Sequence, residues 1–493
     1  MTTAAAHPPI IQGGMGVGVS NWVLAKAVSM RGQLGVVSGT ALDSLFVRRL
    51  QDGDLGGHLR RAMKRFPIPE VATEVLQRYF VPGGKPADEP YAVVPMYRQV
   101  VSRMRHQLTM LANFAEVYLA KEGHDGPVGI NLLTKVQMPN LGSLYGAMLA
   151  GVDYVLMGAG IPKEIPGALD RLAAHLPASL KFDVEGLARG AAEYLHFDPR
   201  EHWDGEPPAA LKRPKFLAII ASNSLATMLA KKANGRVDGF VVEGPTAGGH
   251  NAPPRGETQF NERGEPLYGE RDEVDLPKLA ELGLPFWLAG GAGDPDRVAQ
   301  ALAAGAAGVQ VGTLFAFCEE SGIAPALKQE VIARANAGEI DVRTDPRASP
   351  TGFPFKVVQL EHTVSSLPVY QARERVCDLG YLREAYQDER GRINYRCPAE
   401  PVDTYLKKGG QREDTVGRKC LCNALLADVG HAQRRQDGRA EQPLLTSGDD
   451  LTMMRRFLHG RTAYRAGEVL DYLLARVRGS AGEAAPGRAV AAR

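Results

Sequence analysis

The chain has 493 residues, of which 44% are hydrophobic, and its 58 lysines and arginines against 56 aspartates and glutamates leave a formal net charge of +2. This balance gives no electrostatic support to a nucleic-acid or membrane partner and directs attention to a small-molecule ligand. The opening MTTAAAHPPI lacks the basic and apolar regions of a secretory signal, so we expect a cytoplasmic protein.

Eight short apolar segments recur between residues 9 and 311, and most are separated by helix-compatible segments. Nearly uninterrupted hydrophobic runs are typical of parallel strands buried on both faces, and their alternation with helices predicts an α/β fold. Eight such strands make a (β/α)8 TIM barrel. The expected strands are 9–12, 34–38, 128–133, 154–157, 216–221, 239–242, 285–289 and 308–311, and the expected helices are 22–30, 141–150, 224–234, 276–282 and 296–304.

We expect residues 1–330 to form the barrel domain, with two long inserted connections at about 40–126 and 161–215. The first insertion has helical patterns around 46–65 and 100–122, and the second has one near 166–176. Insertions of this kind are expected over the barrel mouth, where loops set substrate choice, or as structural padding at its rim.

Residues 331–493 are expected to form a mostly helical C-terminal extension that wraps the barrel or joins two subunits of a homodimer. Its tail, from about residue 479, has too little bulky apolar surface to offset the entropy of ordering and is expected to be disordered.

Four of the five cysteines, Cys377, Cys397, Cys420 and Cys422, lie in this extension. Without C-x-x-C spacing we favour buried or incidental thiols and assign no metal site, with a zinc or iron-sulfur site as the alternative. Cys318 is expected to be a small buried apolar side chain.

Glycine-rich segments follow the strands at the ends where barrel enzymes place their reacting groups. Gly290 and Gly291 follow the seventh strand, and Gly312 and Thr313 follow the eighth. Loops at these two positions often bind phosphate through backbone N–H groups. A dinucleotide-binding Rossmann fold is disfavoured, because Val19 stands where the G-x-G-x-x-G pattern needs its last glycine.

The segment EGPTAGGH after the sixth strand places one histidine, His250, directly after two glycines. Glycine permits close approach of the backbone to a ligand, and histidine is the side chain that most readily exchanges a proton near neutral pH. A cofactor and a proton transfer are therefore expected side by side, although a tight turn with a solvated ring has the same local sequence.

Taken together, the chain resembles the flavin-dependent nitronate monooxygenases, formerly called 2-nitropropane dioxygenases. The resemblance covers about residues 8–318 outside the insertions, and its motifs, in family order, are PIIQGGMG, VGINLL, EGPTAGGH, LAGGAGDP and GVQVGTLF. It implies an FMN-binding barrel with His250 as the catalytic base. The implied cofactor-binding residues are Gly14, Met15, Gly16, Asn131, Ala247, Gly248, Gly249, Gly290, Gly291, Gly312 and Thr313.

The chain also departs from this family, and the departures bear on its substrate. Gly14 stands where many members have proline, and the fifth strand ends in Ser222 where a lysine is often found. The insertions and the extension are unusual among the simplest members. FMN binding follows from the shared motifs, whereas the substrate does not.

Our leading hypothesis is oxidation of an alkyl nitronate or nitroalkane with O₂, in which neutral His250 removes the α proton or orients the anion. The alternative is an NAD(P)H-dependent flavin enoyl-thioester reductase that acts with a polyketide or fatty acid synthase, with an acyl carrier protein as its partner. A second alternative is a non-catalytic flavoprotein subunit.

Overall fold

The computed structural model describes residues 7–205 and 207–477, and at its centre eight parallel strands form one sheet. Neighbouring strands in the sheet follow the order β1-β11-β10-β9-β8-β4-β3-β2. Backbone hydrogen bonds between Ile10, Gln12 and Leu34 join the two ends of this sheet, so the barrel is closed. The strands are β1 (Ile10–Gln12), β2 (Gly35–Ser38), β3 (Val128–Leu133), β4 (Tyr154–Gly158), β8 (Lys215–Ile220), β9 (Gly239–Glu243), β10 (Phe286–Ala289) and β11 (Gly308–Val311).

These eight strands coincide, within a residue or two, with the eight predicted apolar segments, so the predicted TIM barrel is confirmed. The barrel interior is filled by large side chains from several strands, and Trp287 is fully buried there. Its indole Nε1 donates to the carbonyl of Pro8, 2.9 Å away, which satisfies the one polar atom of the ring.

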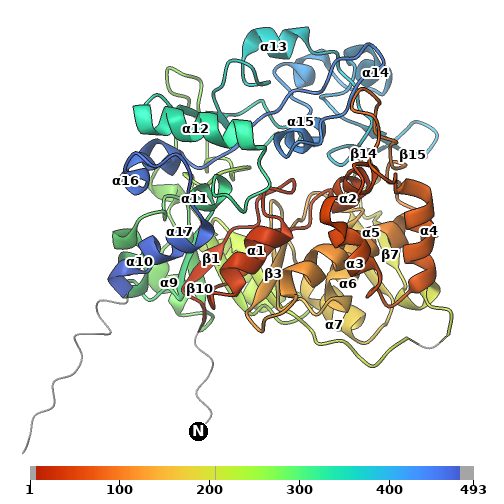
Figure 1. Cartoon of the computed structure of the whole chain (residues 1–493), viewed down its shortest axis with the longest axis horizontal. Coiled ribbons are helices and arrows are strands. Elements are labelled where there is room, and N and C mark those ends of the chain that lie inside the picture. The colour runs from red at the N-terminus through yellow and green to blue at the C-terminus, as the bar shows by residue number, and fades with distance from the viewer. Residues whose placement is uncertain (1–6, 206, 478–493) are drawn as a thin grey trace, which may run out of the picture.

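Helices cover the outside of the barrel between the strands (Figure 1). Polar side chains begin several of them: Asn21 caps α1, Ser222 caps α8 and Asp294 caps α10, each accepting a backbone N–H. Pro295 occupies the first turn of α10, as the sequence predicts. These helices are α1 (Trp22–Ser29), α6 (Asn140–Leu149), α8 (Asn223–Lys232), α9 (Leu276–Ala280), α10 (Pro295–Ala303) and α11 (Thr313–Ala316).

The helices of the first insertion lie beside the barrel (Figure 1), which agrees with the expected structural padding rather than with a cover over the mouth. The longest of them, α5, packs against α1 and α6 and is buried along most of its length. The second insertion adds α7 and an antiparallel hairpin that contacts α6 and α7. The inserted elements are α2 (Leu42–Gln51), α3 (His58–Met63), α4 (Pro69–Tyr79), α5 (Arg103–Lys121), α7 (Ile165–Ala173), β5 (Ala178–Phe182), β6 (Val184–Glu185) and β7 (Glu193–Phe197).

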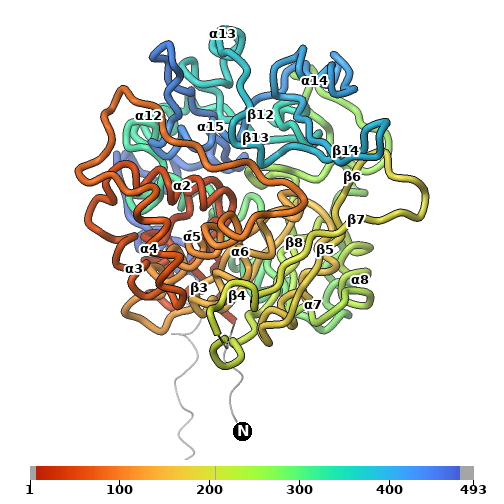
Figure 2. Tube along the Cα trace, turned by 90° about the vertical axis from the view of Figure 1, so that its right-hand side faces the viewer, coloured from red at the N-terminus to blue at the C-terminus, as the bar shows by residue number. Residues whose placement is uncertain are grey.

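Most of the C-terminal extension forms a layer above the barrel (Figure 2), whereas α17 packs beside the barrel against α1, α10 and α11. It is not mostly helical, because long irregular segments and two small sheets accompany its short helices. The boundary expected at residue 330 falls inside α12, and the expected disordered tail lies outside the described residues. Its elements are α12 (Pro325–Ala337), β12 (Val342–Asp345), β13 (Phe355–Val358), α13 (Leu367–Ala372), β14 (Glu384–Gln387), β15 (Ile393–Arg396), α14 (Val402–Lys407), α15 (Leu421–Asp428), η5 (Asp449–Met453), α16 (Arg455–Leu458) and α17 (Ala466–Leu473).

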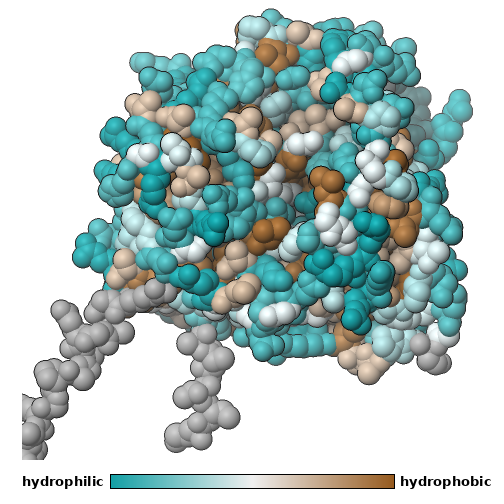
Figure 3. All heavy atoms as spheres, viewed as in Figure 1, coloured by the Kyte–Doolittle hydropathy of each residue, from teal (hydrophilic) through white to brown (hydrophobic). Residues whose placement is uncertain are grey.

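Among the described residues, no helix has the length and apolar character needed to cross a membrane. The face of the molecule seen in Figure 3 is mainly hydrophilic, with hydrophobic residues in small separate groups.

A buried cluster around Asp43 ties the first insertion to the extension. The Asp43 carboxylate on α2 lies 2.6 Å from a guanidinium nitrogen of Arg105 on α5. It also accepts hydrogen bonds from the hydroxyls of Tyr97, at 2.7 Å, and of Tyr381 in the extension. Asp43 is 2% exposed, so its charge depends on these partners rather than on water.

Asp43→Asn should lower the free energy of unfolding by about 3 kcal/mol, because it leaves the Arg105 charge buried without a counter-ion. Urea-induced unfolding followed by circular dichroism measures the change. Asp341→Asn is the matched control, since the Asp341–Arg263 pair is about half exposed and should contribute less than about 1 kcal/mol. Equal effects of the two substitutions would contradict the structural role of the Asp43 cluster.

Candidate functional site

A cavity of about 450 Å³ opens at the carboxyl ends of the barrel strands, within the usual range for small-molecule sites. Every site residue predicted from the sequence lines this one cavity. They are Gly14, Met15, Gly16, Asn131, Ala247, Gly248, Gly249, His250, Gly290, Gly291, Gly312 and Thr313.

The loop after β10 requires glycine at the position closest to the β9 loop. Gly290 has φ +95°, and a Cβ there would lie 2.9 Å from Thr246 Oγ1 and 3.0 Å from the Ala247 nitrogen. Gly291, with φ +63°, continues the same turn before Asp294 begins α10. Backbone N–H groups in such a turn suit an anion such as a phosphate group.

Two buried acceptors in the cavity have no hydrogen-bond partner in the described structure: Gln310 Oε1 and Asn251 Oδ1. Unpaired buried acceptors are costly, so a ligand that carries N–H or O–H donors would stabilise them. A flavin has such donors in its ring N–H and its ribityl hydroxyls. Together with the glycine turns, these atoms make the cavity suitable for the expected FMN.

Gly14 is glycine for a reason other than approach to a ligand. A Cβ at this position would lie 2.3 Å from Cβ of Asn131 and 3.0 Å from Val36, so the end of β1 packs directly on the ends of β2 and β3. Met15 then extends toward Gly312, where a Cβ would lie 3.5 Å from the Met15 sulfur. This packing brings the first, third and eighth strand ends together at the cavity.

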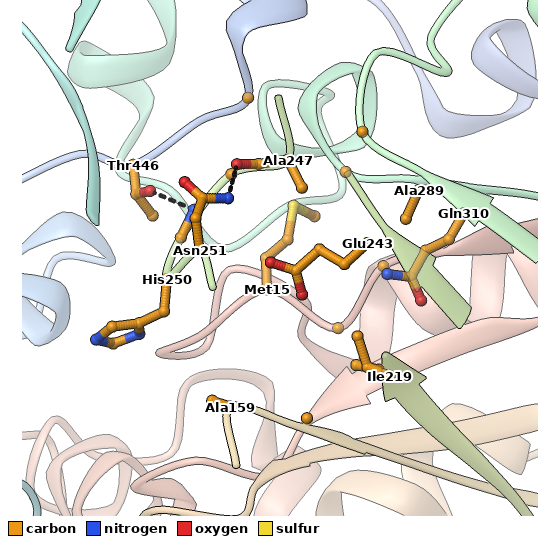
Figure 4. Close-up of a pocket in the computed structure, with 18 of the residues that line it drawn as sticks. Met15, Ala159, Ile219, Glu243, Ala247, His250, Asn251, Ala289, Gln310 and Thr446 are labelled. Atoms are coloured by element: carbon orange, nitrogen blue, oxygen red, sulfur yellow. Dashed lines mark hydrogen bonds between the residues drawn. The ribbon is translucent and has the colours of Figure 1, made fainter. Parts of the chain in front are cut away.

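His250 is held by the extension. Its Nε2 lies 2.7 Å from Oγ of Ser349, and its ring meets the Phe355 ring edge-on with centroids 4.8 Å apart. Burial, with a smaller effect from the Lys135 charge, lowers the His250 pKa to about 4. The imidazole is therefore uncharged at neutral pH, and its ring points away from Glu243 (Figure 4).

Glu243, at the carboxyl end of β9, carries the titratable group that sequence reasoning missed. Its side chain lines the same cavity as Met15 (Figure 4). Burial raises its pKa to about 7, and a hydrogen bond from Asn251 offsets part of that shift. Acidic residues at strand ends are a sequence signal for such a group, because reacting residues of barrels lie there.

The extension also holds the loop between β9 and His250. The Pro354 carbonyl of the extension accepts from the Asn251 N–H at 2.9 Å. The Lys356 N–H of the extension donates to the Gly249 carbonyl, also at 2.9 Å. The Thr446 hydroxyl accepts from the Gly249 N–H at 2.9 Å (Figure 4). No sequence pattern signals these contacts, because the partners lie about 100 to 200 residues apart.

The cysteines are all free thiols. Cys318 is fully buried, and its Sγ lies 3.1 Å from the Phe315 carbonyl, which confirms the expected buried role. Cys377 and Cys397 hydrogen-bond to each other in the extension. Within the described ranges, no group of three or more histidine, cysteine, aspartate or glutamate side chains is arranged to hold a metal ion.

Residues 202–349 match the nitronate monooxygenase family model, which confirms the sequence resemblance over this part of the chain. A probable nitronate monooxygenase of Bacillus subtilis (strain 168) is 33% identical over 148 residues, 29% of this chain and 39% of that protein. The (3aS,4S,5R,7aS)-5-hydroxy-7a-methyl-1-oxo-octahydro-1H-indene-4-carboxyl-CoA dehydrogenase of Rhodococcus jostii (strain RHA1) is 34% identical over 118 residues, 24% of this chain and 29% of that protein.

The chain thus spans less than half the length of these two curated relatives. FabK from Thermotoga maritima aligns over 97% of this chain and 95% of its own at 17% identity, with a TM-score of 0.47. A likeness of that degree carries no inference about function.

Gly290→Ala should weaken flavin binding at least about tenfold, because the new Cβ would push the β9 loop out of place. Gly305→Ala is the matched control: Gly305 also has a positive φ, +85°, but its Cβ would meet no atom within 4 Å. Quenching of flavin fluorescence measures both affinities. Unchanged binding by Gly290→Ala would show that this turn does not contribute to the cofactor site.

Proposed function

We propose that this protein is an FMN-dependent oxidoreductase that uses NAD(P)H to reduce the carbon-carbon double bond of an enoyl thioester. The observation that carries the proposal is Glu243, a half-buried carboxyl group at the carboxyl end of β9, where barrel enzymes place their reacting groups, with a pKa raised to about 7. A group that titrates at the working pH is well matched to proton transfer.

The charge of the cavity supports an uncharged substrate. Its described lining contains two carboxyl groups, Glu243 and Asp450, and no lysine or arginine. An alkyl nitronate is an anion and would lie near these carboxyl groups, and Lys135, which lies over the Phe353 ring behind the lining, is the cation close to His250. An enoyl thioester is neutral at its reacting end and suits the apolar side chains there, which include Ile219, Leu225 and Phe353.

Bound FMN would supply hydride transfer from NAD(P)H to the β carbon of the substrate. Gly290, Gly291 and Thr313 would hold its phosphate, and Asn131 would contact it near the β3 end. Glu243 would hold the proton that the α carbon takes up. Uncharged His250, fixed by Ser349, would orient the thioester through a hydrogen bond.

A thioester substrate is also consistent with one of the relatives, whose name describes a dehydrogenase of a carboxyl-CoA compound. The acyl group would reach this protein on coenzyme A or on an acyl carrier protein.

Nitronate oxidation with O₂ is the second candidate, favoured by the family match over residues 202–349 and by the Bacillus subtilis relative. In that reaction His250 would orient the preformed anion. Removal of an α proton from a nitroalkane is less suited to His250, because a base with a pKa of about 4 is far from the working pH.

Two assays on the purified flavoprotein separate the candidates. Under anaerobic conditions NADPH should bleach the flavin, and crotonyl-CoA should restore its colour. Oxygen uptake with propyl nitronate in the absence of NADPH would instead favour the monooxygenase. A protein that binds FMN and turns over neither substrate would be a non-catalytic flavoprotein.

Glu243→Gln should lower kcat for enoyl reduction about 10²-fold, within the usual contribution of a general acid. The wild-type rate should fall as pH rises above about 7, because Glu243 then loses its proton, and the variant should lack this decline. Glu270→Gln, an exposed glutamate, is the control and should retain the wild-type profile.

His250→Asn should keep the visible flavin spectrum and the decline above pH 7 while raising KM, because its proposed role is orientation. A decline that disappears in His250→Asn and persists in Glu243→Gln would transfer the proton-donor role to His250.

A further inference from the structure

Asp450 of the extension reaches the place where the barrel is expected to bind phosphate. Its Oδ1 hydrogen-bonds to the Thr313 hydroxyl, and its carboxylate also accepts from the Gly293 backbone N–H. The fit is close, since a Cβ on Gly293 would lie 3.0 Å from Asp450 Oδ2 and one on Gly448 would lie 2.7 Å from Oδ1.

The donors that Asp450 uses belong to the same loops that the sequence assigns to a phosphate. Gly293 lies in the loop after β10, and Thr313 directly follows the end of β11. A carboxylate and a phosphate both require hydrogen-bond donors, so the two anions would compete for this corner of the cavity.

No cation in the described structure offsets Asp450 at this corner. Its charged neighbour on its own element, Asp449, is an anion that pairs with Lys356 of β13, with Nζ and Oδ2 2.7 Å apart. From the barrel side, Thr313 and the Gly293 N–H are the groups that face it, and both are uncharged. A dianionic phosphate brought here would therefore meet an unneutralised carboxylate.

We propose that Asp450 is an affinity-determining residue of the cofactor site, and that the phosphate of FMN must displace or neutralise it to bind. The inference rests on the proposed FMN dependence and adds a role for the extension in selecting the cofactor. Flavins without a phosphate do not face this competition. Asp450 consequently lowers the preference of the protein for FMN over riboflavin.

Flavin-fluorescence titrations of the apoprotein with FMN and with riboflavin test this role. Asp450→Asn keeps the size and the acceptor oxygen of the side chain but removes its charge. At pH 8 it should tighten FMN binding at least about tenfold and change riboflavin binding less than about twofold.

Asp403→Asn is the control, because it removes a carboxylate of the extension that is exposed on α14. It should leave the FMN affinity within about twofold of the wild type, with circular dichroism confirming the fold of both variants. If Asp450→Asn leaves FMN binding unchanged, weakens it, or affects riboflavin equally, the inference is overturned while the proposed cofactor stands. If the wild type binds neither flavin, the proposed function falls together with the inference.

Discussion

The site depends on the closure of the barrel between its first and second strands. These strands are short, and their backbones meet only around Ile11 and Leu34. The Gln12 side chain extends the contact: its Oε1 accepts from the Val36 N–H at 3.0 Å, and its Nε2 donates to Ser20 Oγ at 2.8 Å. Because this junction closes the sheet, all eight carboxyl ends face one mouth, and loops far apart in the sequence line a single cavity.

The extension turns that open mouth into a site. Its backbone binds both sides of the loop after β9. On one side the Lys356 N–H donates to the Gly249 carbonyl, and on the other the Asp449 N–H donates to the Thr246 carbonyl. Ser349 fixes the His250 ring from the same layer. The geometry of the loop that carries the conspicuous glycines is therefore determined jointly by the barrel and by residues that follow it in the chain.

The barrel could be predicted from the sequence because each of its strands is buried on both faces and therefore forms an apolar run. The glycine-rich loops could be predicted because only glycine fits at key positions. Positive φ restricts position 290 to glycine, and close packing restricts position 14. Helix α4 and the β5–β7 hairpin were not predicted, although Val71, Val75 and Tyr79 recur at helical spacing in α4 and apolar and polar residues alternate along β5. The positions of both insertions beside the barrel were beyond local pattern.

Two chemical features of the cavity also escaped prediction. Asp450 meets Thr313 across 137 residues of sequence, and no motif links them. Glu243 is the first residue of EGPTAGGH, but its raised pKa follows from desolvation, which only the packed structure reveals. Residue identity thus located the site, whereas its charge balance depended on the surrounding fold.

Because the extension follows the barrel in the chain, the order of synthesis has a consequence for the nascent protein. Segments emerge from the ribosome N-terminal first, so the strands through β11 are available before Thr446 and Asp450 exist. During that interval the apolar side chains at the barrel mouth, among them Ile219 and Leu225, lack the extension residues that line the cavity with them. Stop codons between β11 and Thr446 would leave truncated products that contain the barrel but lack Thr446 and Asp450 of the cavity lining.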